Sequence, residues 1–162
     1  MATKKVVLAF SGGLDTSYCV KYLADKGYEV HSALVDTGGF SDAELKKIED
    51  RAKYLGVASH TTLNLHDRFY NECIKFLIYG NILKNNTYPL SVSAERIFQA
   101  VAIAEYSKSI GAKAIAHGST GAGNDQVRFD MAFAIICPDV EIITPIRDEK
   151  LSRQEERRYL RR

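Results

Sequence analysis

The stretch LAFSGGLDTS, residues 8–17, constrains this chain most, because an apolar run ends there in two glycines, three hydroxyl side chains and one carboxylate. The run KVVLAF is typical of a strand buried on both faces. Residues 15–27 have the composition of a helix that ends at Gly27. A strand, a glycine turn and a helix in this order leave backbone N–H groups unpaired at the positive end of the helix dipole. This corner is therefore predicted to bind an anion.

The same alternation of strand and helix continues along the chain. Further strands are expected at residues 29–36, 57–65, 113–118 and 140–144, and helices at 42–55, 67–83, 93–110 and 125–137, with a loop at 84–91. This order predicts the α/β class: a Rossmann-like parallel sheet of about five strands with helices on both faces. A second glycine-rich loop, residues 118–124, also follows a strand, so both loops are expected at the carboxyl edge of the sheet, where ligands bind.

Composition limits the partners of the protein. A chain of 162 residues suits one domain, and its net charge of +2 argues against a strongly basic nucleic-acid surface. No apolar stretch approaches the roughly 20 residues that span a bilayer. Cys19, Cys73 and Cys137 are far apart and form no C-x-x-C pair, so they are interpreted as small buried hydrophobes. We therefore expect a cytoplasmic protein without nucleic-acid or membrane partners.

The first glycine loop does not match the common nucleotide motifs. It has no lysine, which excludes G-x-x-x-x-G-K-[ST], and its glycine spacing is not G-x-G-x-x-G. Asp15 would repel a bare phosphate, so it indicates a divalent cation or an electrostatic role. The alternative is a serine-glycine turn without a ligand.

Three patches of this sequence resemble one family. SGGLDTS resembles the pyrophosphate-binding motif of the ATP pyrophosphatases, which cleave ATP between its α- and β-phosphates. AHGSTGAGNDQVRF, residues 116–129, and TYPLSVSAER, residues 87–96, are similar to signatures of the argininosuccinate synthases. The resemblance implies an adenine nucleotide alpha hydrolase-like fold. It also implies a ligase of arginine biosynthesis and the urea cycle that joins citrulline to aspartate through citrullyl-AMP, with release of AMP and pyrophosphate.

The resemblance also assigns roles to residues. It implies that ATP contacts Ala9, Phe10, Ser11, Gly12, Gly13, Leu14, Asp15, Thr16, Ser17, Ser32 and Gly118, with Ser32 on the adenine side. It places citrulline at Tyr88, Ser93, Asn124 and Arg128, and aspartate at Thr120, Asn124 and Asp125. No protein nucleophile is needed, Mg²⁺ is implied by the ATP with Asp15 as a candidate ligand, and the full-length protein is expected to be a homotetramer.

Members of this family are about twice as long as this chain or longer. The end of the sequence is what we expect of the N-terminal part of such a protein. Residues 152–155, SRQE, form a capping-box pattern that begins a helix, which reaches Arg162 without a terminating residue. We expect residues 1–150 to form the ATP-binding domain and 151–162 to begin a helix that leads to a second, synthetase domain outside the chain.

Simpler interpretations exist for the individual residues. Tyr88 could pack in its loop, Ser93 could be a helix N-cap, Asp125 a first-turn carboxylate and Arg128 a solvated side chain. His117, at the end of a predicted strand, is interpreted as a hydrogen-bonded structural histidine.

The sequence also departs from the family. Ala122 stands where a lysine is common, Val92 replaces a frequent threonine, and VDTGGF replaces an expected ADIGQ. Two alternative functions stay open: a stand-alone ATP pyrophosphatase acting on tRNA, and a non-catalytic ATP-binding fragment.

Overall fold

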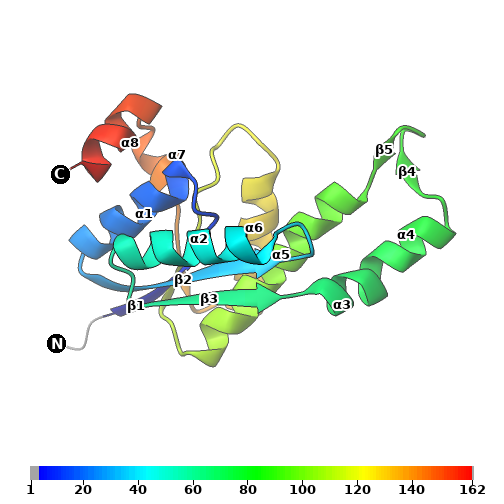
Figure 1. Ribbon diagram of the computed structural model, residues 1–162, viewed down its shortest axis with the longest axis horizontal. Coiled ribbons are helices and arrows are strands. Elements are labelled where there is room, and N and C mark those ends of the chain that lie inside the picture. Colours follow the sequence, from blue (N-terminus) through cyan, green and yellow to red (C-terminus); the bar gives the residue numbers. More distant parts are fainter. Residues whose placement is uncertain (1–3, 162) are drawn as a thin grey trace.

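The computed structural model describes residues 4–161, which form a parallel five-stranded sheet in the order β3-β2-β1-β6-β7 (Figure 1). The strands are β1 (Lys4–Ala9), β2 (Tyr28–Asp36), β3 (Ser59–Asn64), β6 (Ala114–Ala116) and β7 (Glu141–Ile143). The α/β class and the parallel sheet predicted from the sequence are confirmed. The chain runs outward from β1 to β3 and then returns to β6 beside β1, so the topological switch point lies between β1 and β6.

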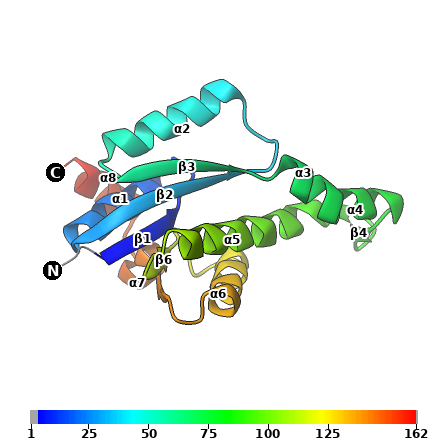
Figure 2. The ribbon, with the colours of Figure 1, turned by 90° about the horizontal axis from the view of Figure 1, so that it is seen from below.

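The central strand β1 supplies side chains to both faces of the sheet. Val6 and Leu8 point to one core cluster and Val7 to the other, as the period of two residues in a strand requires. On the face of Val6, the packed helices are α1 (Leu14–Asp25), α2 (Asp42–Tyr54), α7 (Pro145–Glu149) and α8 (Arg153–Leu160). The face of Val7 packs against α5 (Ser91–Ser109) and α6 (Asp125–Ile136), so helices cover both faces (Figure 2).

Two helices begin where their sequences predict. Ser41 and Ser152 each accept a hydrogen bond from the backbone N–H three residues later, and Glu44 and Glu155 complete the two capping boxes. The helix that Ser152 begins, α8, lies against α1, where the Tyr159 ring meets Tyr18 edge-on at 5.1 Å between centroids. The short helix α7, which begins at Pro145, was not expected from the sequence.

The expected helix over residues 67–83 is wrong in its length and regularity. The chain forms α3 (His66–Phe69), the π-helical turn η1 (Tyr70–Ile74) and α4 (Lys75–Tyr79). A hairpin of β4 (Leu83–Lys84) and β5 (Tyr88–Pro89) then replaces the predicted loop. Asn85 and Asn86 form its turn with φ of 54° and 57°, a conformation that asparagine tolerates better than most residues.

Together α4 and the hairpin form a projecting arm that extends away from the sheet in both views (Figures 1 and 2). The arm exposes large apolar side chains, including Phe76, Ile78 and Tyr79. Within residues 4–161, no helix is both long enough and apolar enough to cross a membrane.

Candidate functional site

The first glycine loop leaves the start of α1 open to a ligand. Gly12 has a φ of +76°, which favours glycine, and Gly13 is the N-cap residue with no side-chain hydrogen bond to the helix. The backbone N–H groups of the first turn are therefore available at the positive end of the helix dipole. The hydroxyls of Ser11 and Thr16 lie 3.3 Å apart beside them.

The two glycine loops meet, as the sequence predicts. A Cβ atom on Gly118 would lie 3.2 Å from Cγ2 of Thr16, and one on Gly12 would lie 3.2 Å from Cγ1 of Ile48. Each glycine thus allows an approach that a side chain would obstruct. The carboxyl ends of β1 and β6 hold the loops side by side at the switch point.

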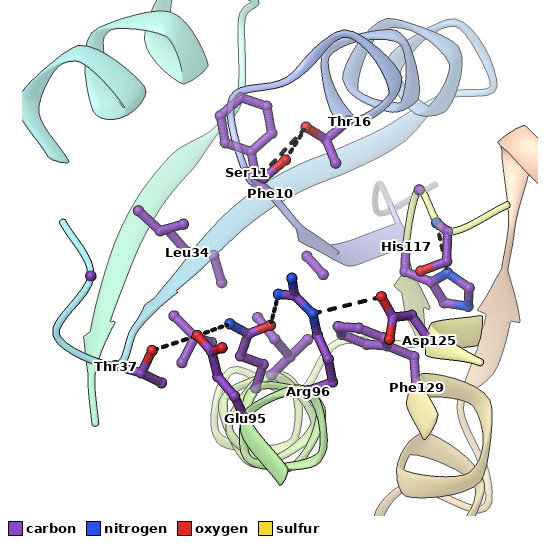
Figure 3. A pocket seen from close by; sticks show the side chains of 18 of the residues that line it. Phe10, Ser11, Thr16, Leu34, Thr37, Glu95, Arg96, His117, Asp125 and Phe129 are labelled. Carbon is purple, nitrogen blue, oxygen red and sulfur yellow. Dashed lines mark hydrogen bonds and ion pairs between the residues drawn. The ribbon is translucent and has the colours of Figure 1, made fainter. Parts of the chain in front are cut away.

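A cavity of about 380 Å³ lies against this junction (Figure 3). Its loop side is formed by Ser11, Thr16, Gly118 and Ser119, and its opposite side by α5 and α6. The carboxyl end of β2 and the following segment add a mostly apolar wall of Ala33, Leu34, Val35, Thr37, Gly39 and Phe40. The volume and the combination of apolar wall and polar groups suit a small organic ligand.

A chain of polar side chains crosses the α5 side of the cavity (Figure 3). Thr37 and Gln99 both donate to Oε1 of Glu95, at 2.7 Å and 3.2 Å. Arg96 Nη1 donates to Oε1 of Gln99 at 2.8 Å, and Arg96 Nε lies 3.6 Å from Oδ2 of Asp125. These hydrogen bonds hold two charged side chains, Glu95 and Arg96, in defined positions along the cavity.

The residues that the resemblance assigns to citrulline are partly brought together. Arg128 donates through Nη1 to Oδ1 of Asp125 at 2.8 Å and through Nη2 to Ser93 Oγ at 3.4 Å. Asn124 directly precedes α6, and Tyr88 lies on the arm with half of its surface exposed. The guanidinium of Arg128 is thus already paired, and a ligand carboxylate would have to compete with Asp125 for it.

The residues that the resemblance assigns to aspartate lie in the second glycine loop and at the start of α6. Thr120 is exposed within the loop, and Asp125 is in the first turn of α6, a position that a carboxylate also favours because of the helix dipole. Ser93 is not an N-cap, because α5 begins at Ser91 and its N-cap residue is Leu90. The earlier start places the Ser93 hydroxyl where it can contact α6.

The buried side chain of His117 anchors the second loop through hydrogen bonds. Its Nδ1 accepts from the Ser119 N–H at 3.2 Å, and its Nε2 donates to Oδ1 of Asp130 at 2.8 Å. Arg147 Nη1 donates to the other oxygen of Asp130 at 2.6 Å. Burial lowers the pKa of His117, and the hydrogen bond to Asp130 opposes that shift. A neutral ring with its proton on Nε2 satisfies both hydrogen bonds, which confirms that His117 is a hydrogen-bonded histidine of the fold.

Two of the ATP candidates are engaged inside the protein instead of facing the cavity. The hydroxyl of Ser32 is fully buried and lies 2.8 Å from Nδ1 of His60. Ser17 is buried and accepts a hydrogen bond from Nε of Arg51 at 3.2 Å. On β2 the cavity is lined instead by Ala33, Leu34 and Val35, whose strand positions near the carboxyl edge were the available signal.

Asp15, in the first turn of α1, has an acidic neighbour from α8. Glu156 is 3% exposed, its Oε2 has no hydrogen-bond partner, and burial together with Asp15 raises its pKa. The C-terminal helix thus reaches the first glycine loop. Of the cysteines, Cys19 and Cys137 are buried as expected, whereas Cys73 is only partly buried.

Comparison with known proteins matches this chain to one family and to relatives that carry a single name. The family described as arginosuccinate synthase N-terminal HUP domain matches residues 5–162. The argininosuccinate synthase of Lactococcus lactis subsp. cremoris is 43% identical over 159 residues, which cover 98% of this chain and 40% of that protein. The enzyme of the same name from Methanocaldococcus jannaschii is 46% identical over 154 residues, with 94% and 38% covered. The chain therefore spans about two fifths of the length of these relatives.

Solved structures share the fold at low identity. A predicted subunit of tRNA methyltransferase from Methanocaldococcus jannaschii superimposes with a TM-score of 0.61 at 18% identity, covering 98% of this chain and 75% of that one. NMN synthetase from Francisella tularensis gives 0.57 at 9% identity, with 73% and 46% covered. These likenesses concern the fold alone. The family match over nearly the whole sequence, with both glycine loops in place, shows that the chain belongs to the argininosuccinate synthase family as its N-terminal HUP domain.

Proposed function

We propose that this chain is the nucleotide-binding part of an argininosuccinate synthase and that ATP occupies the cavity between the two glycine loops. One observation carries the proposal: the uncapped start of α1, opened by Gly12 and Gly13, lies against Gly118 at the switch point of the sheet. Such a corner supplies backbone N–H donors and a positive dipole to phosphate groups. The adjacent cavity of about 380 Å³ has room for a nucleoside beside it.

In the proposed reaction, the ureido oxygen of citrulline attacks the α-phosphorus of ATP. The bond to the bridging oxygen of the β-phosphate breaks, which gives citrullyl-AMP and pyrophosphate. The amine of aspartate then attacks the activated carbon and displaces AMP, which gives argininosuccinate. The protein contributes position and charge stabilisation: the N–H groups of α1 and the hydroxyls of Ser11 and Thr16 would bind the departing pyrophosphate.

The acceptor side of the site would require an exchange of partners. Arg128 is paired with Asp125 in this structure, so a citrulline carboxylate would replace Asp125 on the guanidinium fork. The released Asp125 carboxylate could then attract the ammonium group of aspartate, with Thr120 and Asn124 beside it. Arg96, 3.6 Å from Asp125, would keep that carboxylate in place.

Magnesium fits this site only together with the nucleotide. Among residues 4–161, no group of three or more His, Cys, Asp and Glu side chains could hold a metal ion. Mg²⁺ commonly binds through one or two carboxylates plus substrate phosphates, and Asp15 at the first turn of α1 is the candidate carboxylate. When bound there, the ion would neutralise phosphate charge, while the residues of the first loop orient the phosphates.

Pyrophosphate release from Mg-ATP tests this function. Citrulline and aspartate are added singly and then together, and we expect release that requires citrulline. Release that is independent of citrulline would contradict the assignment. For the complete protein we also propose a homotetramer that acts in the cytoplasm on these small molecules.

A second candidate function is ATP binding without turnover by this chain. It is favoured by one observation, namely that the chain spans about two fifths of its relatives. It predicts saturable ATP binding and no pyrophosphate release with any pair of substrates. Joining the chain to the remaining three fifths of a relative would then restore turnover.

A further inference from the structure

The α5 side of the cavity holds a carboxylate whose charge is not neutralised. Glu95 receives two hydrogen bonds, from the Thr37 hydroxyl and the Gln99 amide, and both end on Oε1. Within residues 4–161, no lysine, arginine or histidine forms an ion pair with Glu95, and its Oε2 makes no hydrogen bond. One carboxylate oxygen is therefore fixed, and the other is available to a hydrogen-bond donor from a ligand.

The orientation of Glu95 is set by a chain of contacts. Arg96 donates to the carboxamide oxygen of Gln99, so the amide nitrogen of Gln99 is turned toward Glu95. Arg96 itself is directed toward Asp125 and does not neutralise its neighbour (Figure 3). The polar side chains around Glu95 thus position an acceptor and do not cancel its charge.

The cavity therefore has two electrostatically different ends. The first glycine loop offers N–H donors and a helix dipole that favour anions, whereas Glu95 disfavours them. The same cavity is also lined by the apolar side chains of Leu34, Val35 and Phe40, which can pack against a flat ring. A nucleotide with its phosphates at the loop would place its base along this wall, toward Thr37 and Glu95.

We propose that Glu95 is a specificity-determining residue that accepts a hydrogen bond from the exocyclic amino group of the adenine base. This inference rests on the proposed binding of ATP. A carboxylate accepts hydrogen bonds and donates none, so it selects a ligand edge that carries an N–H group. A purine without an amino group would leave the carboxylate dehydrated and without a partner, which is unfavourable.

Calorimetric titration of the 162-residue chain tests the proposal with three nucleotides. These are ATP, the triphosphate of purine riboside, which has hydrogen in place of the amino group, and 2′-deoxy-ATP. We expect the wild type to bind the purine riboside triphosphate about 10-fold to 100-fold more weakly than ATP, the range for a hydrogen bond to a charged group. In Glu95→Ala this preference should fall to less than about threefold, and Glu95→Gln should be intermediate because its amide oxygen still accepts. The control Glu105→Ala, on the exposed side of the same helix, should retain the wild-type preference.

Each other outcome overturns the proposal in a recognisable way. Equal wild-type affinity for ATP and the purine riboside triphosphate would refute the role of Glu95 and leave ATP binding intact. A preference that persists in Glu95→Ala would assign the amino group to another acceptor. If Glu95→Ala loses discrimination only against 2′-deoxy-ATP, the carboxylate binds the ribose and not the base. A wild type that binds none of the three nucleotides would refute both this inference and the proposed function.

Discussion

The two glycine loops lie side by side but are held in different ways. The first loop, residues 11–17, is shaped by its own backbone: Gly12 has a positive φ, and Ser11 contacts Thr16 within the loop. The second loop, residues 118–124, is anchored from outside by His117, Asp130 and Arg147, which come from three different parts of the chain. A loop that is shaped locally can be recognised as a sequence motif. A loop that depends on distant partners can be understood only after folding.

The largest expected effect is on the anchor of the second loop. His117→Ala removes a fully buried ring, leaves the Ser119 N–H without its acceptor and deprives Asp130 of one of its two partners, so that only Arg147 still holds Asp130. We expect the free energy of unfolding to fall by about 3 kcal/mol, from lost packing and unpaired polar groups. Urea denaturation measures this change. A loss below about 0.5 kcal/mol would show that the network does not hold the loop.

A smaller effect is expected at the first loop, where Gly12→Ala places a side chain at positive φ and 3.2 Å from Ile48. The strain should cost about 1–2 kcal/mol and weaken ATP binding at least about tenfold, because the N–H groups shift. Gly27→Ala is the matched control, since it has a φ of +83° and open space around it, far from the loop. It should lose stability and keep ATP affinity. Equal loss of affinity in both variants would argue against a role of the first loop in binding.

Acid is expected to lower the free energy of unfolding through His117, the anchor of the second loop. Burial lowers the pKa of His117, so below the unfolded-state pKa of about 6.5 the unfolded chain binds more protons than the folded one. Stability is therefore expected to fall as the pH decreases below about 6.5, with a slope of up to about 1.4 kcal/mol per pH unit from this residue. Denaturation of wild type and His117→Gln across this range isolates its share. A wild-type slope that the substitution leaves unchanged would contradict the assignment.

The smallest effect concerns the contact between α8 and the first loop. Burial and Asp15 raise the pKa of Glu156, so the folded state binds its proton more tightly than the unfolded state does. Its contribution favours folding at low pH and is lost as the pH rises through the raised pKa. Glu156→Gln should stabilise the protein by up to about 1 kcal/mol at pH 7 and by nothing near pH 4. Thermal melting at both pH values tests this, and destabilisation at pH 7 would contradict it.

Short sequence patterns predicted most of the helices and strands and their order. The helix starts at Ser41 and Ser152 follow from hydrogen bonds that span three residues, and both are present. The order of strands and helices and the meeting of the two loops follow from hydrophobic patterning and the rules of parallel sheets. The hairpin of the arm was missed because the left-handed conformations of Asn85 and Asn86 depend on the pairing of two very short strands.

The site was predictable only where its residues act through the backbone. Ser32 was expected near ATP, but its strand register turns the hydroxyl toward His60, and the next three residues of β2 line the cavity. The partners of Glu95 come from the segment after β2 and from one turn further along α5, and no motif links them. Interactions that join separate elements require the fold before they can be identified.

Nuclear magnetic resonance of the ¹⁵N-labelled chain tests the central claim most directly. ATP is titrated in and the backbone amide shifts are followed, with adenosine as the ligand without phosphates. The account predicts large ATP-dependent shifts at Gly12, Gly13 and Leu14, smaller shifts at Ser119, and no comparable shifts at Gly12 and Gly13 with adenosine. Shifts on the arm or along α8, without any at the first loop, would show that the cavity between the glycine loops does not bind the nucleotide.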